Sequence, residues 1–300
     1  MDRPTCQPIK TRTPDSVDRV TDHGPRPLDP PSGIGRTFTR SRRVRLADAD
    51  PAGRLRLDSL LRYTQDVSDD DTTDAGLGDE AAWVARRTVI DELRPAEMGE
   101  SLEVTTFCGG LGRRWAERRL RLVGEGAHYE VSTLWICLDP DSGRPIPLTR
   151  RFLEIYADAA AGRTVRARLT LPGPDDADSG PAPGAAGPAG CGGDQPWPLR
   201  LVDLDIYEHV NNAAYAAALE ELRAGWDVTG PCRWTLEYRA GIDPGARVTL
   251  RWRRRGATTL VWWLVDPEGD AEPGPGRGSG GPEVAATASL EPVSAGLYRS

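Results

Sequence analysis

The chain has 300 residues, the length of about two ordinary domains of ~100 to 150 residues each. With 38% apolar residues, 28% charged residues and a formal net charge of -7, the composition is that of a globular protein able to form two cores. No apolar run reaches the ~18 residues of a membrane-spanning helix, and the acidic balance argues against nucleic-acid binding.

Residues 1–35 are rich in Pro, Asp, Arg and Thr without apolar periodicity, which predicts a disordered tail. They contain no apolar signal-peptide core, so we expect a reducing, cytoplasmic location. The cysteines lack any CxxC pair, which predicts free thiols and no metal site, and no motif calls for a cofactor. The five are Cys6, Cys108, Cys137, Cys191 and Cys232.

The first half is expected to form an N-terminal domain over residues 36–165. Alternating apolar side chains at Phe38, Val44 and Leu46 predict its first strand. Strand-like runs follow later at 101–107, 113–123 and 127–138. Between them, one stripe of side chains recurs at helical spacing and predicts a helix of about three turns. The stripe is Leu57, Leu60, Leu61, Thr64 and Val67.

Residues 166–197 are dominated by Gly, Pro, Ala and Asp, which predicts a flexible linker before a C-terminal domain at 198–294. A helix is expected from Val210 to Leu222, with Asn211 or Asn212 capping its start. Strand-like runs follow at 234–238, 247–255, 258–266 and 284–290. The shared order of strand, helix and further strands predicts an α+β fold, with one helix packed on an antiparallel sheet in each half.

One phrase occurs twice in the chain. The sequence RLADAD at residues 45–50 returns as RLVDLD at 200–205, an offset of 155 residues, and each copy leads into a predicted helix. Two similar domains are the simplest explanation. Only the second copy continues into Glu208-His209-Val210-Asn211-Asn212, so we expect the polar chemistry in the C-terminal half.

Asp205 and His209 are the candidate catalytic groups, four residues apart at the start of the predicted helix. A neutral imidazole accepts a proton from water, a carboxylate holds the imidazole or the water, and backbone amides at a helix start polarise a carbonyl. The chain has no GxSxG motif, so the serine-hydrolase route lacks its signature. The alternative for His209 is a structural hydrogen bond, and for Asp48 and Asp203 a turn-forming role is favoured.

Residues 203–212 together with Tyr215 resemble the signature of the acyl-acyl-carrier-protein thioesterases. Segments at 83–87, 99–104, 112–118 and 235–239 resemble the same family in the same order, over roughly 36–292. The resemblance implies a double hotdog: two antiparallel sheets, each wrapped around a central helix. It also implies hydrolysis of acyl-carrier-protein thioesters in fatty acid biosynthesis, with the acyl pocket in the N-terminal half and catalysis in the C-terminal half.

Two positions depart from the plant members of that family. Tyr207 stands where they carry Asn, and Gly241 stands where they carry Glu. The Tyr207 phenol still donates a hydrogen bond, but Gly241 has no side chain, so we expect Glu237 or Asn212 to compensate. The predicted site is therefore His209, Asp205, Tyr207, Asn211, Asn212 and Glu237.

A second site in the first half is a weaker expectation. Residues 50–53, Asp-Pro-Ala-Gly, resemble the context of a catalytic Asp in some single-hotdog thioesterases. However, Arg54 stands where His209 stands in the second copy, and an isolated carboxylate would still need its own water and oxyanion donors.

The expected partner is an acidic acyl carrier protein bearing a phosphopantetheine thioester. Arginines crowd residues 36–56 and 247–255, where a basic rim would steer such a partner, although a solvated strand face is the alternative. We expect a monomer with an internal pseudo-dimer, or a homodimer. An acyl-CoA thioesterase and a non-catalytic acyl-thioester-binding protein remain alternatives. A hotdog hydratase is disfavoured because Asn-Pro does not precede His209.

Overall fold

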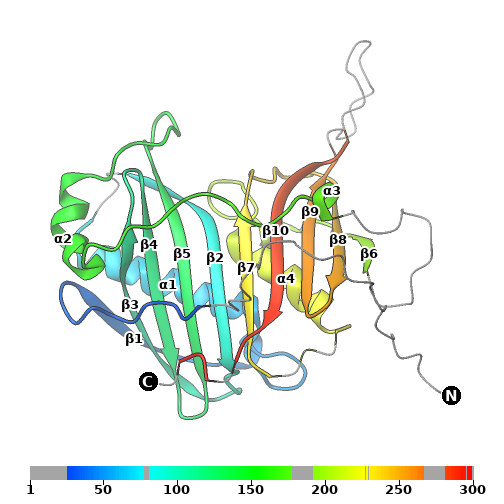
Figure 1. The fold of residues 1–300 in the computed structure, drawn as a ribbon, viewed down its shortest axis with the longest axis horizontal. Coiled ribbons are helices and arrows are strands. Elements are labelled where there is room, and N and C mark those ends of the chain that lie inside the picture. The colour runs from blue at the N-terminus through cyan, green and yellow to red at the C-terminus, as the bar shows by residue number, and fades with distance from the viewer. Residues whose placement is uncertain are drawn as a thin grey trace, which may run out of the picture.

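The computed structural model describes residues 26–77, 81–177, 192–226, 228, 230–266, 281–294 and 296–298. Within them, strands pair antiparallel into one sheet in the order β1-β3-β4-β5-β2-β7-β10-β9-β8-β6 (Figure 1). The N-terminal strands are β1 (Thr37–Arg43), β2 (Ala82–Arg94), β3 (Ser101–Leu111), β4 (Trp115–Val123) and β5 (His128–Leu138). The C-terminal strands are β6 (Gly192–Pro196), β7 (Cys232–Tyr238), β8 (Val248–Arg255), β9 (Thr258–Val265) and β10 (Glu283–Pro292).

The two halves share one continuous sheet instead of forming two separate sheets. The seam is the antiparallel pair β2–β7, in which Ile90 lies opposite Trp234 and Asp91 opposite Arg233. Pairing satisfies the backbone groups that both strands would otherwise leave open at a sheet edge. It also places the buried Asp91 carboxylate against the Arg233 guanidinium, at 2.5 and 2.6 Å. The expectation of two sheets is corrected in this respect.

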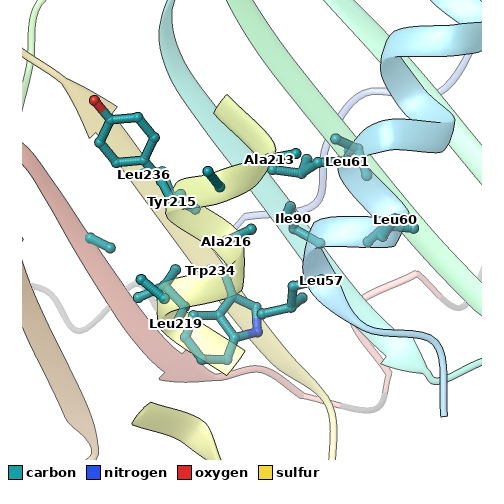
Figure 2. Close-up of a cluster of buried hydrophobic side chains, with 14 of the residues drawn as sticks. Leu57, Leu60, Leu61, Ile90, Ala213, Tyr215, Ala216, Leu219, Trp234 and Leu236 are labelled. Carbon is teal, nitrogen blue, oxygen red and sulfur yellow. The ribbon is translucent and has the colours of Figure 1, made fainter. Parts of the chain in front are cut away.

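Each half contributes one long helix to the same face of this sheet: α1 (Leu57–Asp74) and α4 (Asn212–Arg223), which lie side by side behind it in Figure 1. Figure 2 shows Leu57 and Leu61 on the side of α1 that faces α4, with Ala213 beside Leu61 and Trp234 beside Leu57. Ala213 and Ala216 are buried and short, so the α1 leucines approach the α4 backbone closely. The predicted apolar stripe of α1 is confirmed: all five of its residues are buried.

Two elements of the first half were not predicted. β2 carries Arg86, Arg87, Asp91 and Glu92 among its apolar residues, which hides its period of two. The second is helix α2 (Arg150–Ala160), where Thr149 caps the start by accepting a hydrogen bond from Phe152 N at 3.2 Å. α2 packs on β3 and adds a wall to the N-terminal half, and the described residues of the C-terminal half contain no equivalent helix.

The predicted linker at 166–197 ends earlier than expected, because β6 within it pairs with β8 at the edge of the sheet. Gly193 lies against the indole of Trp252, where a Cβ would come within 2.5 Å of the ring, so a larger residue would require the indole to move. Arg251 holds Asp194 at 2.7 Å. The short helix α3 (Pro174–Ala177) also falls in this stretch, while residues 178–191 lie outside the described residues.

Of the predicted tail, residues 1–25 lie outside the described residues, and 26–35 run without helix or strand before β1. Leu46, expected to belong to the first strand, is 81% exposed in a short 3-10 helix (Leu46–Asp48). In the described part of the chain, no helix combines the length and apolarity required to cross a membrane. Cys108, Cys137 and Cys232 are buried free thiols, whereas Cys6 and Cys191 lie outside the described residues.

Candidate active site

The repeated phrase forms the same turn in both halves. In the first copy the backbone N–H of Arg45 donates to Asp48 Oδ2 at 2.9 Å, and in the second that of Arg200 donates to Asp203 Oδ2 at 2.8 Å. Each aspartate closes a one-turn 3-10 helix, the second at Leu201–Asp203. α1 and α4 then begin 155 residues apart, the same offset as the repeat. The favoured turn-forming role of the first aspartate in each copy is therefore confirmed.

Asp205 closes the next turn, which leads into α4. Its Oδ1 accepts hydrogen bonds from the backbone N–H groups of Tyr207 at 2.9 Å and His209 at 3.3 Å. Glu208 completes the turn in the left-handed region at φ 60°, a conformation that costs a non-glycine residue free energy. Within the described residues, Oδ2 of Asp205 has no hydrogen-bond partner, so one oxygen is fixed and the other is open.

The matching turn of the first half is closed. Asp50 Oδ1 accepts from the backbone N–H groups of Ala52 and Arg54, both at 2.8 Å, as Asp205 does from its own turn. The Asp50 Oδ2, however, accepts from the Arg54 guanidinium at 2.8 and 3.0 Å. Burial alone would raise the Asp50 pKa, but the hydrogen bonds from Arg54 outweigh it and lower the pKa below its usual value. Asp50, the weaker candidate for a second site, is therefore a carboxylate that already binds an arginine.

A cavity of about 720 Å³ begins at the Asp205 turn and extends into the N-terminal half. At one end it is lined by Asp205, Ile206, Tyr207, Asn211 and Asn212, all from the loop before α4 or its first residues. From there it follows a polar stripe of α1 at helical spacing. That stripe is Gln65, Ser68, Asp69, Thr72 and Thr73.

The opposite end of the cavity is aromatic. Trp83 of β2 and Phe152 of α2 lie with ring centroids 5.1 Å apart, and Phe152 and Tyr156 lie 4.9 Å apart. Cys108 is also in this wall. Burial raises the pKa of its thiol to about 11, so it stays protonated near neutral pH and is not a thiolate nucleophile. The cavity therefore offers polar groups at the α4 end and aromatic rings at the other end.

In the described part of the second half, aromatic side chains pack together around α4. Tyr215 of α4 packs edge-on against Tyr238 at 5.3 Å and lies 5.4 Å from Trp263. Trp197 adds a further ring 6.0 Å from Tyr215. This packing occupies the space around Tyr215, whereas the cavity follows α1 in the first half.

The two asparagines lie where the halves meet. Asn211 caps α4 by accepting from Ala213 N at 2.8 Å, which confirms a predicted cap, and its Oδ1 also accepts from Gln65 Nε2 of α1 at 3.2 Å. Asn212 opens α4 and lines the cavity next to Asp205. The start of α4 therefore carries both amide donors and the positive end of a helix dipole at the cavity mouth.

His209 does not line the cavity. The residue is exposed, and its ring lies next to Gly241, where a Cβ would be 3.9 Å from Cδ2 of the imidazole. Gly241 thus leaves the ring without a neighbouring side chain at that position. Tyr207 and Ile206 do line the mouth, and they are 70% and 89% exposed. The structure brings Asp205, Tyr207, Asn211 and Asn212 together at the cavity, and leaves His209 beside it.

Glu237 lies on the other face of the sheet. It is fully buried and accepts hydrogen bonds from the backbone N–H groups of Thr170 at 2.7 Å and Leu171 at 2.9 Å. The segment between α2 and α3, which contains these residues, crosses the face of the sheet opposite α1 and α4 (Figure 1). Glu237 therefore holds this crossing segment and does not reach the cavity.

We expect Glu237→Ala to lower the free energy of unfolding by about 1–3 kcal/mol, because two backbone donors lose a charged acceptor. Chemical denaturation measures this change. Glu237→Gln, which keeps one acceptor oxygen, is expected to lose less. Hydrolytic activity per folded molecule should stay unchanged in both variants, and a selective loss of activity would place Glu237 in the catalytic machinery instead.

Two family profiles match this chain, one in each half. The profile of the acyl-ACP thioesterase N-terminal domain matches residues 35–156, and that of the acyl-ACP thioesterase C-terminal domain matches residues 192–261. The chain belongs to the acyl-ACP thioesterase family. An uncharacterized protein of Mycobacterium tuberculosis strain H37Rv is 31% identical over 234 residues, covering 77% of this chain and 88% of the relative. Membership of this family supports thioesterase activity.

Solved structures share the fold. The 12:0-ACP thioesterase from Umbellularia californica aligns with a TM-score of 0.61 at 19% identity, over 85% of this chain and 96% of that one. An acyl-ACP thioesterase from Bacteroides thetaiotaomicron aligns with a TM-score of 0.59 at 16% identity, over 85% and 97%. At these sequence identities, the similarity shows a shared hotdog fold and nothing more.

Sequence reasoning missed most of the cavity wall. The polar residues of α1 recur at spacings of three and four, which also describes a solvated helix face. Arg118 and Trp135, which line the cavity from β4 and β5, sit in ordinary alternating strands. The usable signal was Thr149 followed by apolar Phe152 and Tyr156 at helical spacing, which indicates an amphipathic helix capped at its start. In the described part of the chain, no cluster of His, Cys, Asp or Glu could hold a metal ion.

Proposed function

We propose that this protein hydrolyses acyl thioesters of an acyl carrier protein, with the reaction at the α4 end of the cavity and the acyl chain in the N-terminal half. In this proposal each half is one hotdog domain, and the two form an internal pseudo-dimer. The observation that carries the proposal is the open Oδ2 of Asp205 at the mouth of the cavity. The Asp50 carboxylate in the matching turn is bound by Arg54.

In the proposed reaction, Asp205 Oδ2 holds a water molecule and takes its proton while the oxygen attacks the thioester carbonyl. The carbon–sulfur bond then breaks, and the proton passes to the thiolate, giving a free fatty acid and a thiol. Asn212 and the positive end of the α4 dipole stabilise the developing oxyanion. The two backbone donors on Oδ1 keep the carboxylate aimed at the cavity.

The mouth is where the carrier would dock. Ile206 and Tyr207 are exposed beside the reactive end, and we propose that they contact the phosphopantetheine arm. Much of the arginine-rich stretch contributes less than expected to steering, because carboxylates already pair with it. Arg36 binds Asp71 and Asp74, Arg42 binds Asp70, and Arg56 binds Asp58.

The direct test is thiol release from matched acyl-carrier-protein and acyl-CoA thioesters of several chain lengths. We expect hydrolysis, with the larger kcat/KM on the carrier-bound substrates. Equal or greater kcat/KM on acyl-CoA would assign the protein to acyl-CoA hydrolysis instead. Binding of both substrates without thiol release would leave an acyl-thioester-binding protein and reject the proposed reaction.

The predicted role of His209 is tested separately. Because its imidazole is exposed and outside the cavity wall, while its backbone N–H holds Asp205, we expect His209→Ala to lower kcat less than tenfold. Steady-state kinetics with one carrier-bound substrate measures this change. A loss of about 100-fold or more, the usual range for a general base, would show that the imidazole turns into the site when substrate binds.

A further inference from the structure

One cationic side chain lies in the wall of the proposed acyl cavity, together with the carboxylates of Asp69 and Glu117. Among the described lining residues, Arg118 of β4 is the only cationic one, and it faces the same side of the strand as Ala116. The guanidinium donates through Nη1 to Asp71 Oδ2 at 2.6 Å and to Thr106 Oγ1 at 3.2 Å. The Tyr156 phenol also lies within reach of the guanidinium, and 12% of the Arg118 side chain stays accessible.

The surroundings hold this arginine in place. Asp71 is buried and accepts from Arg36 Nε at 2.7 Å and from Tyr156 Oη at 2.7 Å, in addition to Arg118. The Tyr156 ring lies under the Arg118 guanidinium, 5.3 Å from Cζ to the ring centroid. The guanidinium is therefore fixed from three elements, and the part of its side chain that stays accessible offers donors to the cavity.

Its depth in the cavity follows from α1. Gln65 lies beside the reactive end and Asp71, the partner of Arg118, lies six residues further along the helix, which is about 9 Å at 1.5 Å per residue. An acyl chain entering from the Asp205 end would pass the guanidinium in its distal part. A saturated chain gives these donors no acceptor and would cover them from water, which costs free energy.

We infer that the cavity selects acyl chains that carry a hydroxyl or keto oxygen in their distal part, with Arg118 as the donor that recognises this oxygen. This inference rests on the proposed thioesterase function. The wall around the arginine supports it, since Ser68 and Thr72 of α1 also line the cavity with hydroxyl groups. A charge-assisted hydrogen bond made only by the oxygenated chain provides the discrimination.

The test compares two carrier-bound substrates: a decanoyl thioester, and the same chain with a ketone two carbons from its end. We expect the purified protein to favour the ketone about tenfold in kcat/KM, the effect of one hydrogen bond to a charged donor. Arg118→Met should abolish or reverse this preference. Because the ratio is measured within one preparation, it does not depend on the fraction of the variant that folds.

Arg42→Met is the matched control, because Arg42 also pairs with α1, binding Asp70 at 2.9 Å, but does not line the cavity. It should keep the tenfold preference. Equal rates on both substrates in the unmodified protein, or an unchanged ratio in Arg118→Met, would overturn the inference. If neither thioester is hydrolysed, the proposed function fails. Calorimetric binding of the two corresponding free acids to the unmodified protein and Arg118→Met then still decides whether the cavity prefers the oxygenated chain.

Discussion

Asp205→Asn is expected to lower kcat by about 100-fold to 10,000-fold, the usual contribution of a positioned general base. The amide oxygen of Asn can still accept the hydrogen bonds from Tyr207 and His209 that shape the turn, so the loop should keep its conformation. What disappears is the open carboxylate oxygen at the cavity mouth. Steady-state hydrolysis of a carrier-bound substrate measures kcat, and thermal unfolding checks that the fold is kept.

The internal repeat supplies a matched control for this prediction. Asp50→Asn makes the same change at the equivalent turn of the first half, where Arg54 already binds the carboxylate and the residue does not line the cavity. We expect Asp50→Asn to leave kcat within about twofold and to act mainly on stability, as a lost ion pair does. Equal losses of activity in the two variants would show a structural effect of the turn and would reject Asp205 as the base.

The second large effect concerns the joint between the halves. Arg223 of α4 donates to both oxygens of the buried Glu92 carboxylate on β2, at 2.7 and 2.8 Å, and its Nη1 lies 3.5 Å from Glu220. We expect Arg223→Met to lower the free energy of unfolding by about 3–5 kcal/mol, because it leaves buried negative charge without a partner. Chemical denaturation measures the loss.

The double variant Arg223→Met with Glu92→Gln is the control, since it removes the unpaired charge as well. It should recover a large part of the lost stability. If the double variant is less stable than Arg223→Met by the full effect of a second independent mutation, the two side chains are not coupled and the ion pair is not the cause.

The pKa of Glu220 decides how the stability loss of Arg223→Met depends on pH. Burial raises its pKa above the usual value even though Arg223 acts to lower it. A carboxyl whose pKa is higher in the folded state than in the unfolded state stabilises below its unfolded pKa, and this contribution is lost as pH rises through the folded pKa. Removing Arg223 raises the folded pKa further. The deficit of Arg223→Met should therefore be larger at pH 8 than at pH 5.

The turns around the repeated phrase could be predicted from the sequence. The aspartates of the repeated phrase shape turns through hydrogen bonds to nearby backbone groups, and such local geometry is encoded within a few residues. Asn211 as a helix cap was predictable for the same reason. The position of the His209 side chain was not, because the space around its ring depends on Gly241, which lies on a separate segment after β7.

Glu237 illustrates a different limit. The alternation of β7 indicated that its side chain points away from Leu236 and Tyr238, but alternation alone does not say what covers that face. In the structure, the segment between α2 and α3 crosses there and supplies backbone donors to the carboxylate. A crossing between segments some 66 residues apart is a tertiary event with no local signal.

The sequence by itself determined the helix that follows each copy of the repeated phrase, the positions of most strands and the family, because periodicity, capping and repeated motifs are local properties of the chain. Only the tertiary structure decided that one sheet runs through both halves, since edge pairing between β2 and β7 depends on how the two halves meet. It also decided which aspartate stays open and where the 720 Å³ cavity lies. Those differences arise from individual side chains: Arg54 binds Asp50, and Trp263 packs against Tyr215. These contacts exist only once the chain has folded.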